Sequence, residues 1–131
     1  MFAVEVRDHI MIAHSLPSPV FGPAQGMHGA TFTVDAAFIA DSIDDHGLVV
    51  DMGLAIEALA EVLAPLRYRN LDEVPDFAGQ FTTTEFLCGQ IHKGLAQRVR
   101  AGALNDGGRV TRLRITLHES HMARAWCEAE V

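Results

Sequence analysis

The chain has 131 residues, with 10 Lys and Arg against 17 Asp and Glu, a formal net charge of −7, and 49% apolar side chains. This length fits a single domain over residues 1–131 that needs no disulfide framework, because domains most often run about 100–150 residues. The acidic balance excludes a protein that binds nucleic acid through its phosphates, since such binding depends on clustered Lys and Arg.

Cysteine content and hydropathy indicate the compartment. Cys88 and Cys127 are too few for a disulfide framework, so we expect two free thiols packed within the fold. No apolar run approaches the roughly 18–20 residues that a membrane-spanning helix needs, and the first ten residues lack the cationic and then apolar pattern of a signal peptide. We therefore expect a cytoplasmic protein without a membrane partner.

The first half of the chain predicts two long strands and a helix. Val, Ile and Phe are frequent over Phe2–His14, which indicates a strand, and the prolines of Ser15–Gly26 indicate a loop. A second strand is expected over about Gly29–Ile43, where apolar and polar residues alternate. Asp51 has the character of an N-cap for a helix over Met52–Leu66, in which apolar residues recur every three or four positions.

The second half predicts another helix and two more strands. Tyr68–Thr82 shows no regular pattern, and Thr82 with Glu85 has the form of a capping box that opens a helix running to about Arg100. A half-buried strand, a hairpin turn and a last strand follow, over Arg112–Leu117, His118–His121 and Met122–Ala129. The order ββααββ predicts the α+β class, with a four-stranded antiparallel sheet and two helices on one of its faces.

Seven histidines raise the question of a metal site. His14 ends the first predicted strand and His28 begins the second, so antiparallel pairing would bring both imidazoles to one end of the sheet. Two neutral imidazoles suit zinc, which usually takes three or four protein ligands from N and S donors. A lone histidine is more often solvated or structural, so spacing by itself gives only a two-residue zinc hypothesis.

Glu119, Thr83 and Thr84 are candidates for ligand recognition. Glu119 lies at the tip of the last predicted hairpin, where a carboxylate is usually only solvated. Thr83 and Thr84 lie at a helix start, where they are most economically interpreted as caps. Exposed hydroxyl and N–H groups at such a position can also face a polar ligand. The patterns themselves leave both interpretations open.

Five short segments fall in the order and spacing of one enzyme family: Ala13-His14-Ser15-Leu16-Pro17, Met27-His28-Gly29-Ala30-Thr31-Phe32, Leu48-Val49-Val50-Asp51-Met52, Thr83-Thr84-Glu85 and His118-Glu119-Ser120. Through them nearly the whole chain resembles the 6-pyruvoyl-tetrahydropterin synthase and 6-carboxytetrahydropterin synthase family. The resemblance implies the tunnelling fold, in which trimers join their sheets into a barrel and two trimers stack. It therefore implies a homotrimer or homohexamer with sites at subunit interfaces, and closing the barrel would also remove the edge strands.

The resemblance also implies a site, position by position. His14 and His28 match two of the family's three zinc-binding histidines. Glu119 matches the glutamate that grips the pterin ring, where a carboxylate can accept two N–H bonds from the aminopyrimidine edge. Thr83 and Thr84 match positions near the pterin. The implied ligand is a small pterin-like molecule, and the implied cofactor is zinc.

The zinc site departs from the family pattern at one position. The third zinc-binding histidine, two residues after His28, is Ala30 in this chain. Alanine has no donor atom, so zinc would need another ligand or the site would be weakened or empty. The candidates are a ligand oxygen, His118, His121 or, against strand parity, His9.

The family's catalytic residues are also replaced. The position of the catalytic cysteine holds Ala24, and the catalytic Asp-His pair matches Arg67-Tyr68. Tyr68 is then the candidate for moving protons, with Arg67 and Arg69 beside it to favour the charged phenolate. The alternative is that these three residues form a solvated loop.

Two classes of function follow from the resemblance. The first is a diverged zinc-dependent lyase that acts on a 7,8-dihydroneopterin triphosphate-like substrate. The alternative is a non-catalytic pterin- or purine-binding protein, or an enzyme acting on a different heterocyclic substrate. Both classes predict that a heterocycle binds at Glu119, whereas a purely structural interaction module predicts no such binding.

Overall fold

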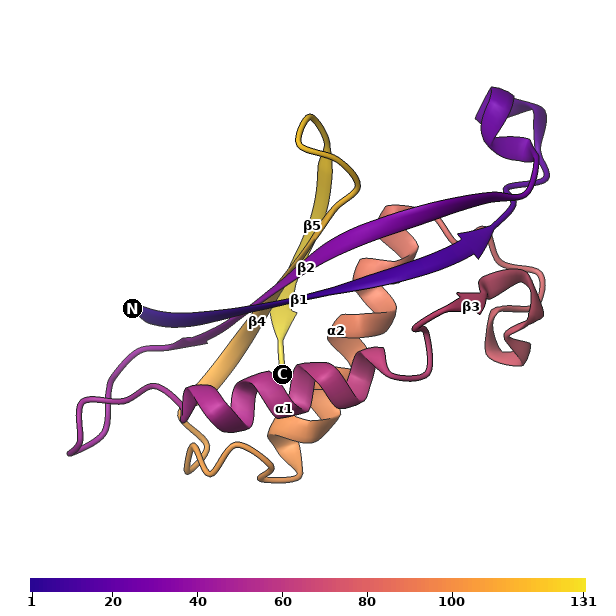
Figure 1. Cartoon of the computed structure of the whole chain (residues 1–131). Helices are drawn as coiled ribbons and strands as arrows, with labels where there is room; N and C mark the ends of the chain where they lie inside the picture. The colour runs from indigo at the N-terminus through magenta and orange to yellow at the C-terminus, as the bar shows by residue number, and fades with distance from the viewer.

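The computed structural model describes residues 1–131 as a twisted sheet with two helices on one side (Figure 1). The sheet has five strands in the order β3-β1-β2-β4-β5. All neighbours are antiparallel except for the parallel pair of β1 and β3. The bounds are β1 Phe2–His14, β2 His28–Ala40, β3 Arg69–Asn70, β4 Val110–His118 and β5 Arg124–Glu130. The predicted α+β class is confirmed.

The helices are α1 (Met52–Leu63) and α2 (Thr84–Arg100), with short 3-10 turns at Pro19–Gln25, Leu71–Glu73 and Pro75–Phe77. The predicted N-cap of α1 is confirmed, because the Asp51 carboxylate accepts the N–H groups of Gly53 and Leu54 at 2.7 and 3.1 Å. The helix ends three residues before the predicted Leu66, in a series of turns. Neither helix is long and apolar enough to cross a membrane.

The predicted cap of α2 was wrong by one residue. Thr83 is the N-cap, and its hydroxyl accepts the N–H of Phe86 at 3.2 Å. Thr82 lies just outside the helix, is 2% exposed, and bonds to the ring of His14 instead. Three consecutive threonines offer three possible caps, and the tertiary contact to His14 selects among them.

The two-residue strand β3 was not predicted. Its residues pair with Ile12 and Ala13, which adds a fifth strand to the expected four. The two residues before β3 are held against β1. Tyr68 donates its N–H to the Met11 carbonyl at 2.8 Å, and the Arg67 guanidinium donates a hydrogen bond to the His9 carbonyl at 2.6 Å. A segment this short has no periodicity that the sequence could reveal.

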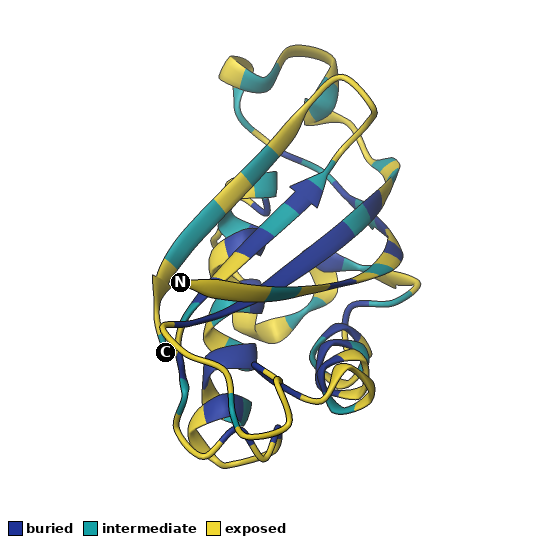
Figure 2. Ribbon diagram, turned by 90° about the vertical axis from the view of Figure 1, so that its left-hand side faces the viewer, coloured by how far each residue is buried: buried dark blue, intermediate teal, exposed yellow.

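The core lies between the sheet and the two helices. Buried residues alternate with more exposed ones along much of β1 and β4, whereas β2 is buried without interruption from Val34 to Ala40 (Figure 2). Side chains from both layers with at most 1% exposure fill this space, among them Ile10, Phe32, Phe38, Leu59, Leu63, Leu87, Leu95 and Leu113. The even-numbered residues of β1 and β2 face this core over much of their length, and the same alternation places His14 and His28 on the core side at the end of the hairpin.

Candidate functional site

His14 and His28 face each other at the end of the β1–β2 hairpin. They are direct partners in the antiparallel register, as the sequence predicted from the strand ends. Their ring centroids are 4.6 Å apart with an interplanar angle of 64°. His14 is only 4% exposed, whereas His28 is half-buried. The hairpin therefore brings two imidazoles to one point of the fold.

One nitrogen of each ring is engaged by a neighbour. The His28 Nδ1 lies 2.8 Å from the Gly26 carbonyl, which only accepts hydrogen bonds, so this Nδ1 carries the proton and Nε2 presents its lone pair. The His14 Nδ1 lies 3.0 Å from the Thr82 hydroxyl. Burial, followed by the neighbouring His28, lowers the pKa of His14 and favours its neutral form. Neutral imidazoles with one nitrogen held by a second group are the usual state of metal-binding histidines.

A small cavity opens beside these two rings. Its volume is about 190 Å³, and its walls come from the ends of β1 and β2, the loop between them, the start of α2 and the β4–β5 turn. The chain brings five of the six predicted site residues to this cavity, namely His14, His28, Thr83, Thr84 and Glu119. Ala24 and Glu85 also line it.

Tyr68, the sixth predicted residue, lies elsewhere. It does not line this cavity, it is 82% exposed, and its backbone has a left-handed φ of 55°. The guanidinium of the neighbouring Arg67 donates hydrogen bonds to the His9 carbonyl and the Asp8 carboxylate. Within one protomer the structure therefore does not bring Tyr68 to the histidines, and its proton-transfer role stays a prediction.

The donor set for a metal is incomplete within one protomer. The chain has no group of three or more His, Cys, Asp or Glu side chains placed to hold a metal ion. Ala30 shares a strand face with His28 but has no donor atom. Among the proposed replacements, His118 is bonded to Asp35 on the other face of the sheet. The residues present therefore fit a two-imidazole site completed by a bound ligand, and not one closed by three protein side chains.

The two cysteines are free thiols packed between α2 and the sheet. The Cys88 thiol donates to the Ala125 carbonyl at 3.3 Å, and burial raises its pKa to about 12. Burial also raises the pKa of Cys127. Neither cysteine lines the cavity of His14 and His28, in agreement with the predicted packing role.

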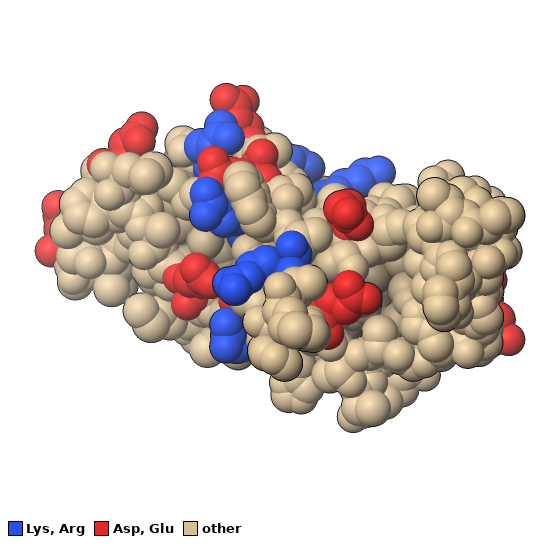
Figure 3. All heavy atoms as spheres, turned by 90° about the horizontal axis from the view of Figure 1, so that it is seen from above, with Lys and Arg blue, Asp and Glu red and all other residues tan.

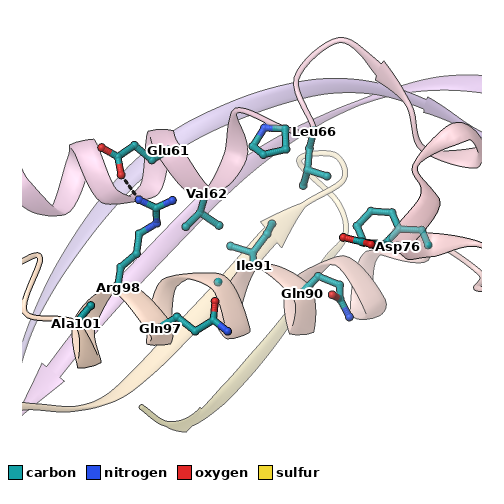
Figure 4. A pocket seen from close by; sticks show the side chains of 12 residues that line it. Glu61, Val62, Leu66, Asp76, Gln90, Ile91, Gln97, Arg98 and Ala101 are labelled. Atoms are coloured by element: carbon teal, nitrogen blue, oxygen red, sulfur yellow. Dashed lines mark hydrogen bonds and ion pairs between the residues drawn. The ribbon is translucent and has the colours of Figure 1, made fainter.

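The largest cavity lies away from all predicted site residues. It is a groove of about 600 Å³ between α1 and α2, and the ion pair of Glu61 with Arg98 crosses it near one end (Figure 4). Val62 and Ile91 are among its apolar residues. Its charged groups include a paired acid and base, and it contains no histidine, cysteine or hydroxyl side chain. The smaller cavity at His14 and His28 is therefore the better candidate for chemistry.

Comparison with solved structures places this fold among pterin synthases. The chain superposes on the 6-pyruvoyl tetrahydropterin synthase of Caenorhabditis elegans with a TM-score of 0.82 at 18% identity, covering 98% of this chain and 95% of that one. It superposes on the Plasmodium vivax synthase with a TM-score of 0.76 at 17% identity over all of both chains. These identities are low, so the likeness shows a shared fold.

Sequence comparison identifies the family. No curated protein is found to match the chain by its sequence. The family model described as 6-pyruvoyl tetrahydropterin synthase, however, matches residues 3–130. This match covers nearly the whole chain and agrees with the structural likeness. The chain therefore belongs to the 6-pyruvoyl tetrahydropterin synthase family.

Proposed function

We propose that this chain binds a pterin-like heterocycle in the cavity beside His14 and His28, as a diverged member of its family. One observation carries the proposal: five residues matched to the family's site come from separate parts of the chain and line the same small cavity. A chain that kept only the fold would have no reason to retain imidazoles, hydroxyls and a carboxylate around one space.

Glu119 supplies the recognition of the ring. Its side chain is exposed at the cavity, and no cation of the chain forms a salt bridge with it. A free carboxylate can accept two parallel N–H bonds from an aminopyrimidine edge, which is a selective geometry and a stronger one than neutral hydrogen bonds provide. Thr83 and Thr84, at the start of α2, have hydroxyls that can bond the remaining polar edge of the ring.

Zinc would be held by His14 and His28. Ligand oxygens or water would complete its coordination, since Ala30 contributes nothing. Zinc, when bound, would polarise a hydroxyl or carbonyl group on the side chain of the ligand. The chain's own contribution is to orient both imidazoles through the Thr82 hydroxyl and the Gly26 carbonyl, while burial favours the neutral form of His14.

The reaction proposed is that of a lyase acting on a 7,8-dihydroneopterin triphosphate-like substrate. The alternative of a non-catalytic pterin- or purine-binding protein, or of an enzyme for another heterocycle, is favoured by Ala24. Its methyl group lines the cavity at the position matched to the family's catalytic cysteine. An alanine moves no proton, so turnover requires another acid or base.

We further propose that the chain forms a homotrimer or homohexamer. The free side of β5 and the N-terminal part of β1 lack strand partners, since β3 pairs only with Ile12 and Ala13. Unpaired edges of this kind are usually closed or covered. On β5, Trp126 is 58% exposed beside this free edge. Joining such edges between copies would close a barrel.

Binding of 7,8-dihydroneopterin, followed by its fluorescence, tests the pterin pocket. Glu119→Gln should weaken binding at least about tenfold, because losing one partner of a buried hydrogen bond costs about 1–3 kcal/mol. Glu85→Gln is the matched control, since Glu85 lines the same cavity and is not assigned to the ring. Equal affinities for wild type and Glu119→Gln, or no binding by the wild type, would contradict the proposal.

A further inference from the structure

The helix-free face of the sheet carries its own cluster of charged residues. Viewed from the side opposite α1, basic and acidic side chains are interleaved in a band across the molecule (Figure 3). On this face Arg7 of β1 is the direct strand partner of Asp35 of β2. His118, at the end of β4, completes the cluster from the third strand.

Asp35 is the centre of this cluster. Asp35 is 5% exposed. Its carboxylate accepts two hydrogen bonds from the Arg7 guanidinium, one from Nε at 2.6 Å and one from a terminal nitrogen at 2.9 Å. The Arg7 guanidinium holds the pKa of Asp35 below its ordinary value, against the opposing effect of burial. Asp35 is therefore a fixed carboxylate that only accepts hydrogen bonds.

This carboxylate determines the orientation of His118. The Nε2 of His118 lies 2.7 Å from the Asp35 Oδ2, so Nε2 carries a proton and donates it. When the ring is neutral, its lone pair is then on Nδ1. An imidazole held at one nitrogen by a buried carboxylate, with the other nitrogen free, is an arrangement suited to general acid–base work.

The Nδ1 of His118 is accessible. It has no hydrogen-bond partner in the chain, and it is not a buried atom left unsatisfied, since the one such side-chain atom is the Arg109 Nε. His118 lines a polar cavity of about 300 Å³ that contains no apolar side chain. Thr31, Thr33 and His121 are among the other residues lining it.

Glu119 connects this cavity with the proposed ligand pocket. It lines both the polar cavity of His118 and the smaller cavity of His14 and His28. A ligand whose ring is held by Glu119 therefore lies at the junction of the two spaces. His118, next to Glu119 in the sequence, lines the polar cavity and is held at Nε2 by Asp35.

We propose that His118 is the acid–base group of this protein, with Asp35 and Arg7 as its positioning residues. The proposal deepens the proposed function and rests on it. His118 Nδ1 accepts a proton from a side-chain carbon of the bound pterin as the C–H bond breaks, and its electron pair stays on the substrate. The imidazolium, stabilised by Asp35, exchanges this proton with solvent and then delivers a proton to a carbon atom of the substrate. No electrons are gained or lost overall, and no co-reactant is needed.

The competing explanation is that the three residues only join three strands. His118→Gln separates the two explanations, because a glutamine amide can still donate a hydrogen bond to Asp35 but cannot take up a proton. A structural role predicts that this variant keeps every property of the wild type. His121→Gln is the matched control, since His121 lines the same cavity without a carboxylate partner.

The test incubates the purified, zinc-supplied full chain with 7,8-dihydroneopterin triphosphate in D₂O. Deuterium entering carbon-bound positions of the recovered pterin is measured by mass, and pterin affinity is measured in parallel. We expect the wild type and His121→Gln to incorporate deuterium. In His118→Gln the rate of deuterium incorporation should fall about 100-fold or more, while the affinity for the pterin stays nearly unchanged. Asp35→Asn should show the same separation of rate from affinity, and it serves as the second variant if His118→Gln does not fold.

Three different outcomes would contradict these proposals. Incorporation that survives in both His118→Gln and Asp35→Asn overturns the proposal for His118 and leaves the pterin pocket standing, particularly if Tyr68→Phe abolishes it. Pterin binding by the wild type without any incorporation also overturns the acid–base role. Absence of pterin binding by the wild type overturns the proposed function, and the proposal for His118 with it.

Discussion

The two faces of the sheet differ in what they contribute. The face covered by α1 and α2 is apolar, and Phe32 and Phe38 on it are at most 1% exposed. The helix-free face carries Arg7, Asp35 and His118, joined by hydrogen bonds between side chains. The covered face holds the apolar core, and the other face holds a cluster of charged and polar side chains bonded to one another. Strand alternation thus separates the apolar core from the charged cluster, and Glu119 lines a cavity on each side.

Substitutions on the two faces of β2 should differ strongly in their cost to stability. Phe38→Ala should lower the free energy of unfolding by about 3–5 kcal/mol, because it leaves a cavity in a closely packed layer. Thr31→Ala, on the exposed helix-free side of the same strand, should change it by less than about 0.5 kcal/mol. Urea denaturation measures both. Similar costs at the two positions would show that the helix-free face also carries stability.

A histidine at position 30 tests whether zinc binds at the end of the β1–β2 hairpin, beside His14 and His28. Ala30→His should raise zinc affinity on the order of 100-fold, since one ligand contributes a share of the roughly 10–16 kcal/mol of a complete structural zinc site. Competition with a chelating dye measures the affinity. Thr31→His is the control, because its side chain projects to the opposite face. An equal gain in the control would mean that zinc does not bind beside His14 and His28.

The pH dependence of stability should show two acid steps, one from each face. The pKa of His14 is lowered from 6.5, so the unfolded state binds the proton more tightly and stability is lost as pH falls below about 6.5. The pKa of Asp35 is lowered from 3.8, so its contribution is present above about pH 3.8 and is lost as pH falls through the lower folded value.

Thermal unfolding across this pH range, repeated with His14→Gln and Asp35→Asn, assigns the two steps. The first variant should remove the step near neutral pH, and the second should remove the more acid one. A wild-type stability that stays flat from pH 7 to pH 5 would contradict the buried, neutral state of His14.

Two glycines of α2, Gly89 and Gly94, should respond differently to replacement by alanine. A Cβ on the exposed Gly89 would meet nothing within 4 Å, whereas one on Gly94 would lie 3.2 Å from a Val62 methyl group of α1. Gly89→Ala should therefore raise the free energy of unfolding by about 0.5–1 kcal/mol, the usual difference in helix propensity. Gly94→Ala should gain less because Val62 must shift. A larger gain at Gly94 would indicate loose packing between the helices.

The sequence predicted what depends on alternation and on strand ends. The pairing of His14 with His28 followed from two strands joined by a proline-rich loop, and strand parity placed His9 away from His14. The contacts between distant residues were not predicted. The hydrogen bond of Thr82 with His14 and that of Asp35 with His118 join residues 68 and 83 positions apart. Such contacts depend on the exact register and on side-chain rotamers, for which the local pattern contains no signal.

A crystal structure of the protein with 7,8-dihydroneopterin would show whether Glu119 holds the pterin ring. We expect both Glu119 carboxylate oxygens to lie within hydrogen-bond distance of ring N–H groups, with the pterin in the cavity beside His14 and His28. A pterin bound in the groove between α1 and α2, or a Glu119 carboxylate turned away from the ring, would contradict this expectation.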